Sequence, residues 1–181
     1  MAQGTSGRVR QGFGAGALGT LALTAWEPLR DAVLGHPPVY AVDRLARRGA
    51  RRWWGWKLSP RIAQRWGLGM RWVYGPTLGA LYAWSRPFLP PAALRGGVLL
   101  GLAVGAFEWL SFAPLRVTAP PRTWSRAEHG LLVFQVLLFG LVTEAVLSHG
   151  KARKSEADIP QDEALNDSAR TDHGLDFENS R

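Results

Sequence analysis

The 181-residue sequence has no cysteine and only four histidines. Without cysteine, the chain has no disulfide, no thiolate metal site and no thiol nucleophile. Its few serines do not form the strand–turn–helix pattern of a nucleophile elbow. The histidines lie in separate connections or near the C-terminus, without a second ligand at a metal-binding spacing. We therefore expect no enzyme, and predict no catalytic residue, cofactor or metal ligand.

Acidic residues are scarce before residue 150, where 6 Asp and Glu accompany 17 Lys and Arg. The last 31 residues carry 8 acids and 5 bases, and few large apolar side chains. Such a segment cannot bury enough apolar surface to fold alone, so residues 149–181 are predicted to be an acidic disordered tail. The pI near 11.0 would suit nucleic acid. However, the bases cluster beside apolar runs, which favours anionic lipid and no nucleic-acid partner.

Four apolar segments follow an N-terminal arm of residues 1–11: residues 12–29, 67–84, 96–115 and 130–148. Each is about 18 to 20 residues long, which is the length that crosses a hydrocarbon core of about 30 Å. The sequence therefore predicts an all-α integral membrane protein with four transmembrane helices. The alternative is a soluble bundle, but the third and fourth segments lack the charged outer stripe of a soluble helix.

The first and third segments repeat one pattern, AGALGTLALTAWEPLR and GGVLLGLAVGAFEWLS, 81 residues apart. In both, small residues recur every four positions and lead to a glutamate. This spacing places them on one helical face, as in helices that pack closely in lipid. The first series is Gly16, Thr20, Thr24 and Glu27, and the second is Gly97, Gly101, Gly105 and Glu108.

The second and fourth segments correspond more loosely, with Gly79 matching Gly140 at an offset of 61. We expect Gly75 and Gly79 to be the packing residues of the second segment. The repeated unit is then a helix hairpin, and two hairpins that enter from the same side are parallel repeats about an axis along the membrane normal. The repetition also argues against the alternative that the first segment is a cleaved signal peptide.

The longest connection contains a basic amphipathic segment at about residues 38–57. Val39, Val42 and Leu45 begin an apolar stripe, arginines occupy the other positions, and Trp53 begins the motif WWGWK. This composition is typical of a helix lying in the membrane interface against anionic lipid; the alternative is a solvated loop. Because the odd-numbered connections are richer in Lys and Arg, the positive-inside rule places them in the cytoplasm, with both termini outside.

Three acids fall inside the predicted spans: Glu27, Glu108 and Glu144. An ionisable residue there costs about 2.5 to 3.5 kcal/mol on insertion scales, so we expect each acid to have a functional or structural role. One hypothesis is a path for protons or cations through acids at staggered depths. The other is structural: Glu27 would form an ion pair with Arg71, and Glu144 would extend to the nearby water. Glu108, near mid-span, is the acid that the structural hypothesis explains least well.

Short motifs in the third and fourth segments provide a family resemblance. They are Ser111-Phe112-Ala113-Pro114-Leu115, Pro120-Pro121, His129-Gly130-Leu131 and Glu144. On these motifs the chain resembles the YagU-like family of small, uncharacterised bacterial inner-membrane proteins. The resemblance implies a multi-pass inner-membrane location and transfers no catalytic residue. The chain departs from the family pattern in its Arg- and Trp-rich first loop, and His129 precedes the glycine instead of following it.

From the sequence we expect a membrane protein that acts through helix association with itself, as a homo-oligomer, or with a membrane partner. The alternative is a proton- or cation-handling channel or transporter that uses the intramembrane glutamates. Disruption of assembly by leucine at Gly101 or Gly105 would favour the first hypothesis. Loss of a proton-coupled flux in a Glu108→Gln variant would favour the second.

Overall fold

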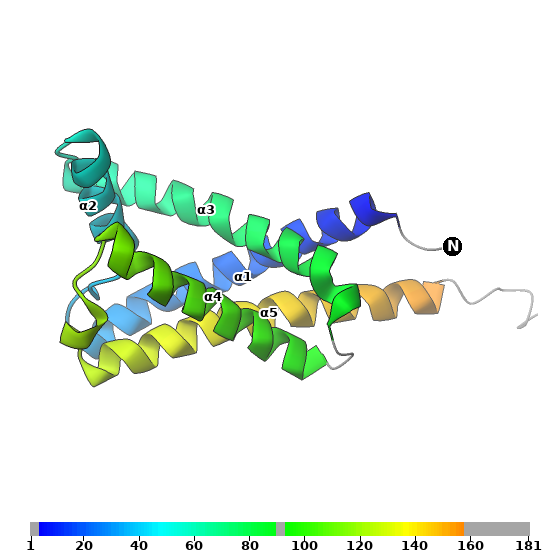
Figure 1. Cartoon of the computed structure of the whole chain (residues 1–181). Helices are drawn as coiled ribbons and strands as arrows, with labels where there is room; N and C mark the ends of the chain where they lie inside the picture. Colours follow the sequence, from blue (N-terminus) through cyan, green and yellow to red (C-terminus); the bar gives the residue numbers. More distant parts are fainter. Residues whose placement is uncertain (1–3, 90–92, 158–181) are drawn as a thin grey trace, which may run out of the picture. The chain divides into compact units, whose positions relative to one another are not determined.

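The computed structural model describes residues 4–89 and 93–157. Within these ranges the regular structure is entirely helical, as the sequence predicts (Figure 1). Contacts divide the chain into two units, Met1–Ser148 and His149–Arg181. Five α-helices and two short 3₁₀ turns occur in the described ranges: α1 (Thr5–Leu34), α2 (Val42–Trp54), α3 (Pro60–Ser85), η1 (Arg86–Phe88), α4 (Ala93–Leu115), η2 (Pro121–Thr123) and α5 (Arg126–Ala157).

Two predicted boundaries differ from the structure. Helix α1 begins at Thr5, inside the expected N-terminal arm, because no proline interrupts the residues before the apolar run. Helix α5 continues to Ala157, so the first nine residues of the expected disordered tail are helical. That stretch contains Lys, Arg, Ala and Glu, which are strong helix formers. The rest of the predicted tail, residues 158–181, lies outside the described residues.

Local sequence signals account for several helix ends. Helices α1 and α2 end at Gly35 and Gly55, whose φ angles of 70° and 69° are left-handed and favour glycine. Helix α3 starts with Pro60 in its first turn, where a missing N–H costs nothing. Helix α5 starts with a reciprocal cap, in which Ser125 Oγ accepts from the Glu128 N–H at 3.1 Å and the Glu128 carboxylate accepts from the Ser125 N–H at 2.9 Å.

Helices α1 and α3 are antiparallel and approach backbone to backbone through glycine. A β-carbon added at Gly16 would lie 2.5 Å from the Gly75 carbonyl oxygen, and one at Gly79 would lie 2.6 Å from the Gly16 Cα. A β-carbon at Gly12 would meet the Gly79 carbonyl oxygen. No larger residue fits at these positions without separating the two helices.

Helices α4 and α5 meet through an equivalent contact. A β-carbon at Gly101 would lie 2.6 Å from the Val136 carbonyl oxygen, and one at Gly97 would lie 3.1 Å from the Gly140 carbonyl oxygen. A β-carbon at Gly140 would in turn lie 2.6 Å from the Gly101 nitrogen. The small-residue faces of α1 and α4 are therefore occupied by α3 and α5 of the same chain.

The two contacts correspond residue by residue, in a register that differs from the sequence alignment. The atoms nearest a β-carbon on Gly12 belong to Ala83, Gly79 and Ala80, and those nearest one on Gly97 belong to residues numbered 61 higher, 144, 140 and 141. Gly12 therefore corresponds to Gly97, and α1 matches α4 at an offset of 85. The alignment predicts an offset of 81, one helical turn less, because it matches the glutamates instead of the contacts.

Side-chain contacts join the two pairs of helices. Trp26 of α1 lies against Phe134 of α5, with ring centroids 4.7 Å apart, and Tyr74 of α3 stacks on Phe107 of α4 at 6.3 Å. Each of the four long helices thus contacts two antiparallel neighbours. Helix α2 packs on the first turns of α3, where a β-carbon added at Gly67 would lie 2.6 Å from the Val42 carbonyl oxygen (Figure 1).

Large apolar side chains are exposed along α1, α3 and α4 and at two neighbouring positions of α5, whereas several polar ones are buried. Exposed examples are Phe13, Leu21, Leu29 and Val33 on α1, Ile62, Trp72, Val73 and Leu81 on α3, Leu99, Leu102, Trp109 and Leu110 on α4, and Val133 and Phe134 on α5. Buried polar residues include Thr20, Arg30, Glu128, Gln135, Thr143 and Glu144. Among the described residues, one helical segment, Arg126–Gly150, is both long and apolar enough to cross a membrane by composition.

Candidate functional site

A cavity of about 700 Å³ lies between the four long helices at the end where α2 packs. Every α-helix contributes to its lining, which is largely apolar and aromatic. Helix α2 turns its apolar face inward: Val42, Leu45, Ala46 and Trp53 all line the cavity. Helix α2 lies within the predicted basic amphipathic segment of about residues 38–57. Its apolar stripe contacts the cavity of its own chain.

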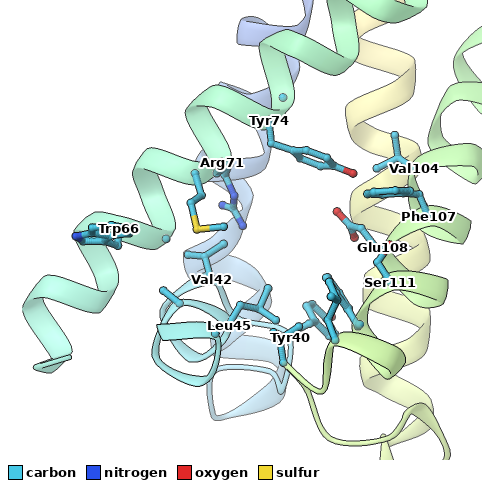
Figure 2. A pocket seen from close by; sticks show the side chains of 18 of the residues that line it. Tyr40, Val42, Leu45, Trp66, Arg71, Tyr74, Val104, Phe107, Glu108 and Ser111 are labelled. Carbon is cyan, nitrogen blue, oxygen red and sulfur yellow. The ribbon is translucent and has the colours of Figure 1, made fainter. Parts of the chain in front are cut away.

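Glu108 is the acidic side chain in the cavity lining. Figure 2 shows its carboxylate pointing from α4 into the cavity, near the hydroxyl of Tyr74 from α3. Among the described residues, Glu108 makes no hydrogen bond or ion pair. The positive charge that acts on its carboxyl group is that of Arg71. The Tyr74 hydroxyl is buried and also has no hydrogen-bond partner in the described chain. Two polar groups thus face an apolar space without an internal partner.

Arg71, the basic side chain in the lining, is engaged by a different acid. Its Nη1 lies 2.8 Å from Glu27 Oε1, an ion pair by distance that is not aligned as a hydrogen bond. This is the pair that the structural hypothesis for Glu27 predicts. Arg30 Nη2 approaches the same carboxylate at 3.6 Å and lies 2.7 Å from Asp31 Oδ1. The four groups carry two positive and two negative charges, so the network is neutral without Glu108.

Arg30 is almost completely buried, with 2% of its surface exposed. It also donates to the Gln135 side chain of α5 at 3.3 Å and lies over the Tyr40 ring at 5.8 Å. Burial raises the pKa of Tyr40 to about 12, so the hydroxyl stays protonated and donates to the Glu128 carbonyl at 3.1 Å. The floor of the cavity is therefore fixed by hydrogen bonds that join α1, α5 and the loop between α1 and α2.

Glu144 lies outside the cavity lining and is fully partnered. Its carboxylate accepts from the Tyr82 hydroxyl at 2.7 Å, from Ser148 Oγ at 2.8 Å and from the Arg86 guanidinium. The residue is 3% exposed. The expectation that Glu144 extends to water is therefore wrong. Partners from α3, η1 and its own helix satisfy it instead.

The predicted packing residues Thr20, Thr24 and Gly105 do not all make the same kind of contact. Thr20 Oγ1 donates to the Gly16 carbonyl and occupies the space in which a β-carbon on Gly75 would lie. Gly105 takes the corresponding place in the second pair, facing the Val136 side chain at 3.1 Å. Thr24 donates to the carbonyl of Thr20 at 2.9 Å, within its own helix. The small residues thus pack the helices of one chain together.

Several residues of these networks were missed from the sequence. Tyr74, Tyr82 and Arg86 are single polar residues in or beside an apolar run, and no spacing rule connects them to Glu108 or Glu144. Arg30 carries a weak signal, since it lies three residues after Glu27 on one helical face. The cap at the start of α5 has a clear signal, the sequence SRAE from residue 125.

Within the described part of the chain, no three His, Asp or Glu residues come together as metal ligands. The comparisons with known proteins give no assignment either: the chain matches no family model, no curated protein and no solved structure.

Proposed function

We propose that this chain is a four-span integral membrane protein that exchanges a proton or another cation at Glu108, inside a cavity between its spans. The observation that carries the proposal is the Glu108 carboxylate, which faces an apolar cavity without an ion-pair or hydrogen-bond partner among the described residues. The other two acids in the spans have partners, so only Glu108 has its charge available.

The distribution of side chains supports the membrane part of the proposal. A soluble helix carries charge on its outer face and buries its apolar stripe. Here Arg30, Glu144 and Gln135 are buried, while large apolar side chains are exposed along α1, α3 and α4 and near the start of α5. Lipid is the solvent in which this arrangement is favourable, because intramembrane ionisable residues face the interior and pair with one another.

The paired glycine contacts support four spans. If α5 crosses the bilayer, then α4 does so too, because their backbones meet at Gly97, Gly101 and Gly140. The equivalent contact between α1 and α3 extends the argument to the first pair. The two pairs then form parallel hairpin repeats with both termini on one side. The family resemblance and the basic first loop are consistent with a bacterial inner membrane and with cytoplasmic odd-numbered loops.

Helix α2 fits an interfacial position in this arrangement. Its arginines lie away from the apolar face that lines the cavity. Helix α2 has Asp43 in its first turn and Arg51 and Arg52 in its last turn, which suits the helix dipole. Basic side chains next to a span attract anionic lipid, each contributing about 1 kcal/mol near the surface.

Association with itself or with a partner is less well supported by the packing. The small-residue faces on which that hypothesis depends are filled by α3 and α5 of the same chain. A homo-oligomer or a membrane partner would have to use the outward apolar faces instead. Leucine at Gly101 should therefore destabilise the monomer itself, whether or not the chain assembles.

Proteoliposomes with an imposed pH gradient and valinomycin-clamped potential test the proposal. The wild-type chain should dissipate the gradient faster than protein-free vesicles, and Glu108→Gln should abolish the difference. Asp43→Asn is the matched control, since it removes one acid that lies on α2 outside the cavity lining. A wild-type rate equal to that of empty vesicles, or an unchanged rate in Glu108→Gln, would contradict the proposal.

A further inference from the structure

We infer that the cavity binds a lipophilic organic cation, with its charge at Glu108 and its apolar body among the aromatic side chains. This inference rests on the proposed function, because it identifies the class of cation that the same site accepts. Size is the first argument. A volume of about 700 Å³ lies in the middle of the range of sites for drug-sized molecules, roughly 300 to 1,000 Å³.

The sign of the charge is the second argument. Two charged side chains line the cavity, Arg71 and Glu108. Arg71 is held by Glu27 at 2.8 Å, within a network whose charges cancel. Glu108 is left as the one lining carboxyl group without a partner, in an apolar environment where an unpaired charge is costly, so it either takes up a proton or binds a cation. A bound cation relieves that cost, and a bound anion increases it.

Aromatic side chains provide the third argument. Four tryptophans, Trp53, Trp54, Trp56 and Trp66, line the side of the cavity formed by α2, the following loop and α3. Indole rings attract cations through their π faces, and this attraction is strongest for weakly hydrated organic cations. In Figure 2, Glu108 faces the cavity from α4, and Trp66 lies on the part of α3 to the left of Arg71.

The scarcity of oxygen ligands argues against a small inorganic cation as the preferred occupant. Calcium requires six to eight oxygen ligands, and magnesium needs near-octahedral oxygen coordination. The side chains that line the cavity offer one carboxylate, Glu108, and a few neutral oxygens such as those of Tyr74, Ser111 and Gln135. A cation with an apolar body matches this lining better than a hydrated ion.

Tetraphenylphosphonium and tetraphenylborate are suitable probes, since they have similar size and shape and opposite charge. Equilibrium dialysis of the full-length protein in detergent, with protein-free micelles as the reference, measures binding of each. We expect saturable binding of tetraphenylphosphonium and none of tetraphenylborate. Glu108→Gln should weaken tetraphenylphosphonium binding at least tenfold, whereas Glu108→Asp and the control Asp43→Asn should retain it.

Acidification should also weaken binding, because a proton on Glu108 removes the charge that holds the cation. The titratable groups that interact with Glu108 are Arg71 and Tyr74 from α3 and Tyr40 from the loop between α1 and α2. The lining residues from α1, α2 and α5 carry no titratable group. The pH dependence should therefore disappear in Glu108→Gln.

Equal binding of both probes, no binding of tetraphenylphosphonium, or full binding by a folded Glu108→Gln variant would overturn the inference. The outcome is separable from that of the proposed function. A Glu108-dependent proton flux without tetraphenylphosphonium binding would reject only the organic cation. Binding without any flux would retain the site and reject the exchange.

Discussion

The two helix pairs, α1 with α3 and α4 with α5, pack through corresponding glycine contacts but differ in their acids and their connections. In the first pair, Glu27 is neutralised by Arg71 and Arg30. In the second pair, Glu108 has no partner among the described residues and faces the cavity. Only the first connection contains an inserted helix, α2. Shared contacts therefore provide the scaffold, and the positions at which the pairs differ form the cavity and its charge.

The largest expected effect comes from blocking a shared glycine contact. Leucine at Gly79 would drive its side chain into the α1 backbone, and leucine at Gly140 would do the same to α4. Overpacking usually costs about 1 to 3 kcal/mol, and backbone-to-backbone contact places both variants at or above the upper end. We expect the thermal unfolding midpoint in detergent to fall by roughly 6 to 12 °C in each.

Gly69→Leu and Gly130→Leu are matched controls, because they occupy corresponding positions on α3 and α5. A β-carbon at either glycine would have nothing within 4 Å. Leucine is a better helix former than glycine, so neither variant should lower the midpoint. An equal loss in controls and test variants would show that glycine is needed for some other reason than close approach.

A smaller effect on stability is expected at one layer of the packing, which the two helix pairs fill with different residues. Thr20 opposes Gly75 in the first pair, whereas Gly105 opposes Val136 in the second, so the large and small residues are exchanged. Gly75→Val should cost about 2 kcal/mol. Adding Thr20→Gly should restore most of the loss, since it recreates the second pair's arrangement. A double variant no more stable than Gly75→Val alone would argue against corresponding layers.

Removal of the acids should affect stability in opposite ways. Glu27→Gln leaves Arg71, which is 12% exposed, without its ion-pair partner. We expect a loss of about 1 to 2 kcal/mol, less than for a fully buried pair because Glu27 is partly exposed. Glu108→Gln removes a carboxyl group that has no partner among the described residues, so it should leave stability unchanged or raise it. Thermal unfolding of both variants at one pH makes the comparison, and a larger loss for Glu108→Gln would reverse the assignment of roles.

The smallest effect concerns the helix starts. Ser125 caps α5 through two reciprocal hydrogen bonds with Glu128, whereas Ser59 precedes α3 without a side-chain cap. Ser125→Ala should therefore cost about 1 kcal/mol, and Ser59→Ala should cost almost nothing. The unfolding midpoints of the two variants provide the test, which fails if both change equally.

The helical class and the small-residue faces could be predicted from the sequence because both depend on local periodicity. Gly16 and Gly101 are packing residues in the structure as in the prediction. The register between the pairs could not be predicted. Sequence alignment pairs Glu27 with Glu108. The backbone contacts pair Gly16 with Gly101 instead, and the two registers differ by one helical turn.

The polar part of the site could be predicted only in part. The Glu27–Arg71 pair could be predicted, because the hydropathy pattern places these two opposite charges at similar depths in neighbouring predicted spans. The partners of Glu144 come from three separate elements, and Arg86 lies just after the second apolar segment, at a position with no local signal. The cavity depends on how α2 packs on α3, which is a tertiary contact that no periodicity encodes.

The central claim, that four helices cross a bilayer as two parallel hairpins, can be tested most directly by single-cysteine labelling. The natural chain has no cysteine, so Ser6→Cys, Lys57→Cys, Arg95→Cys and Arg122→Cys would each carry one thiol. A membrane-impermeant maleimide added to intact cells should label the cysteines at residues 6 and 95, and those at 57 and 122 only after permeabilisation. If residues 57 and 122 were labelled from opposite sides, or residues 6 and 57 from the same side, the account would be contradicted.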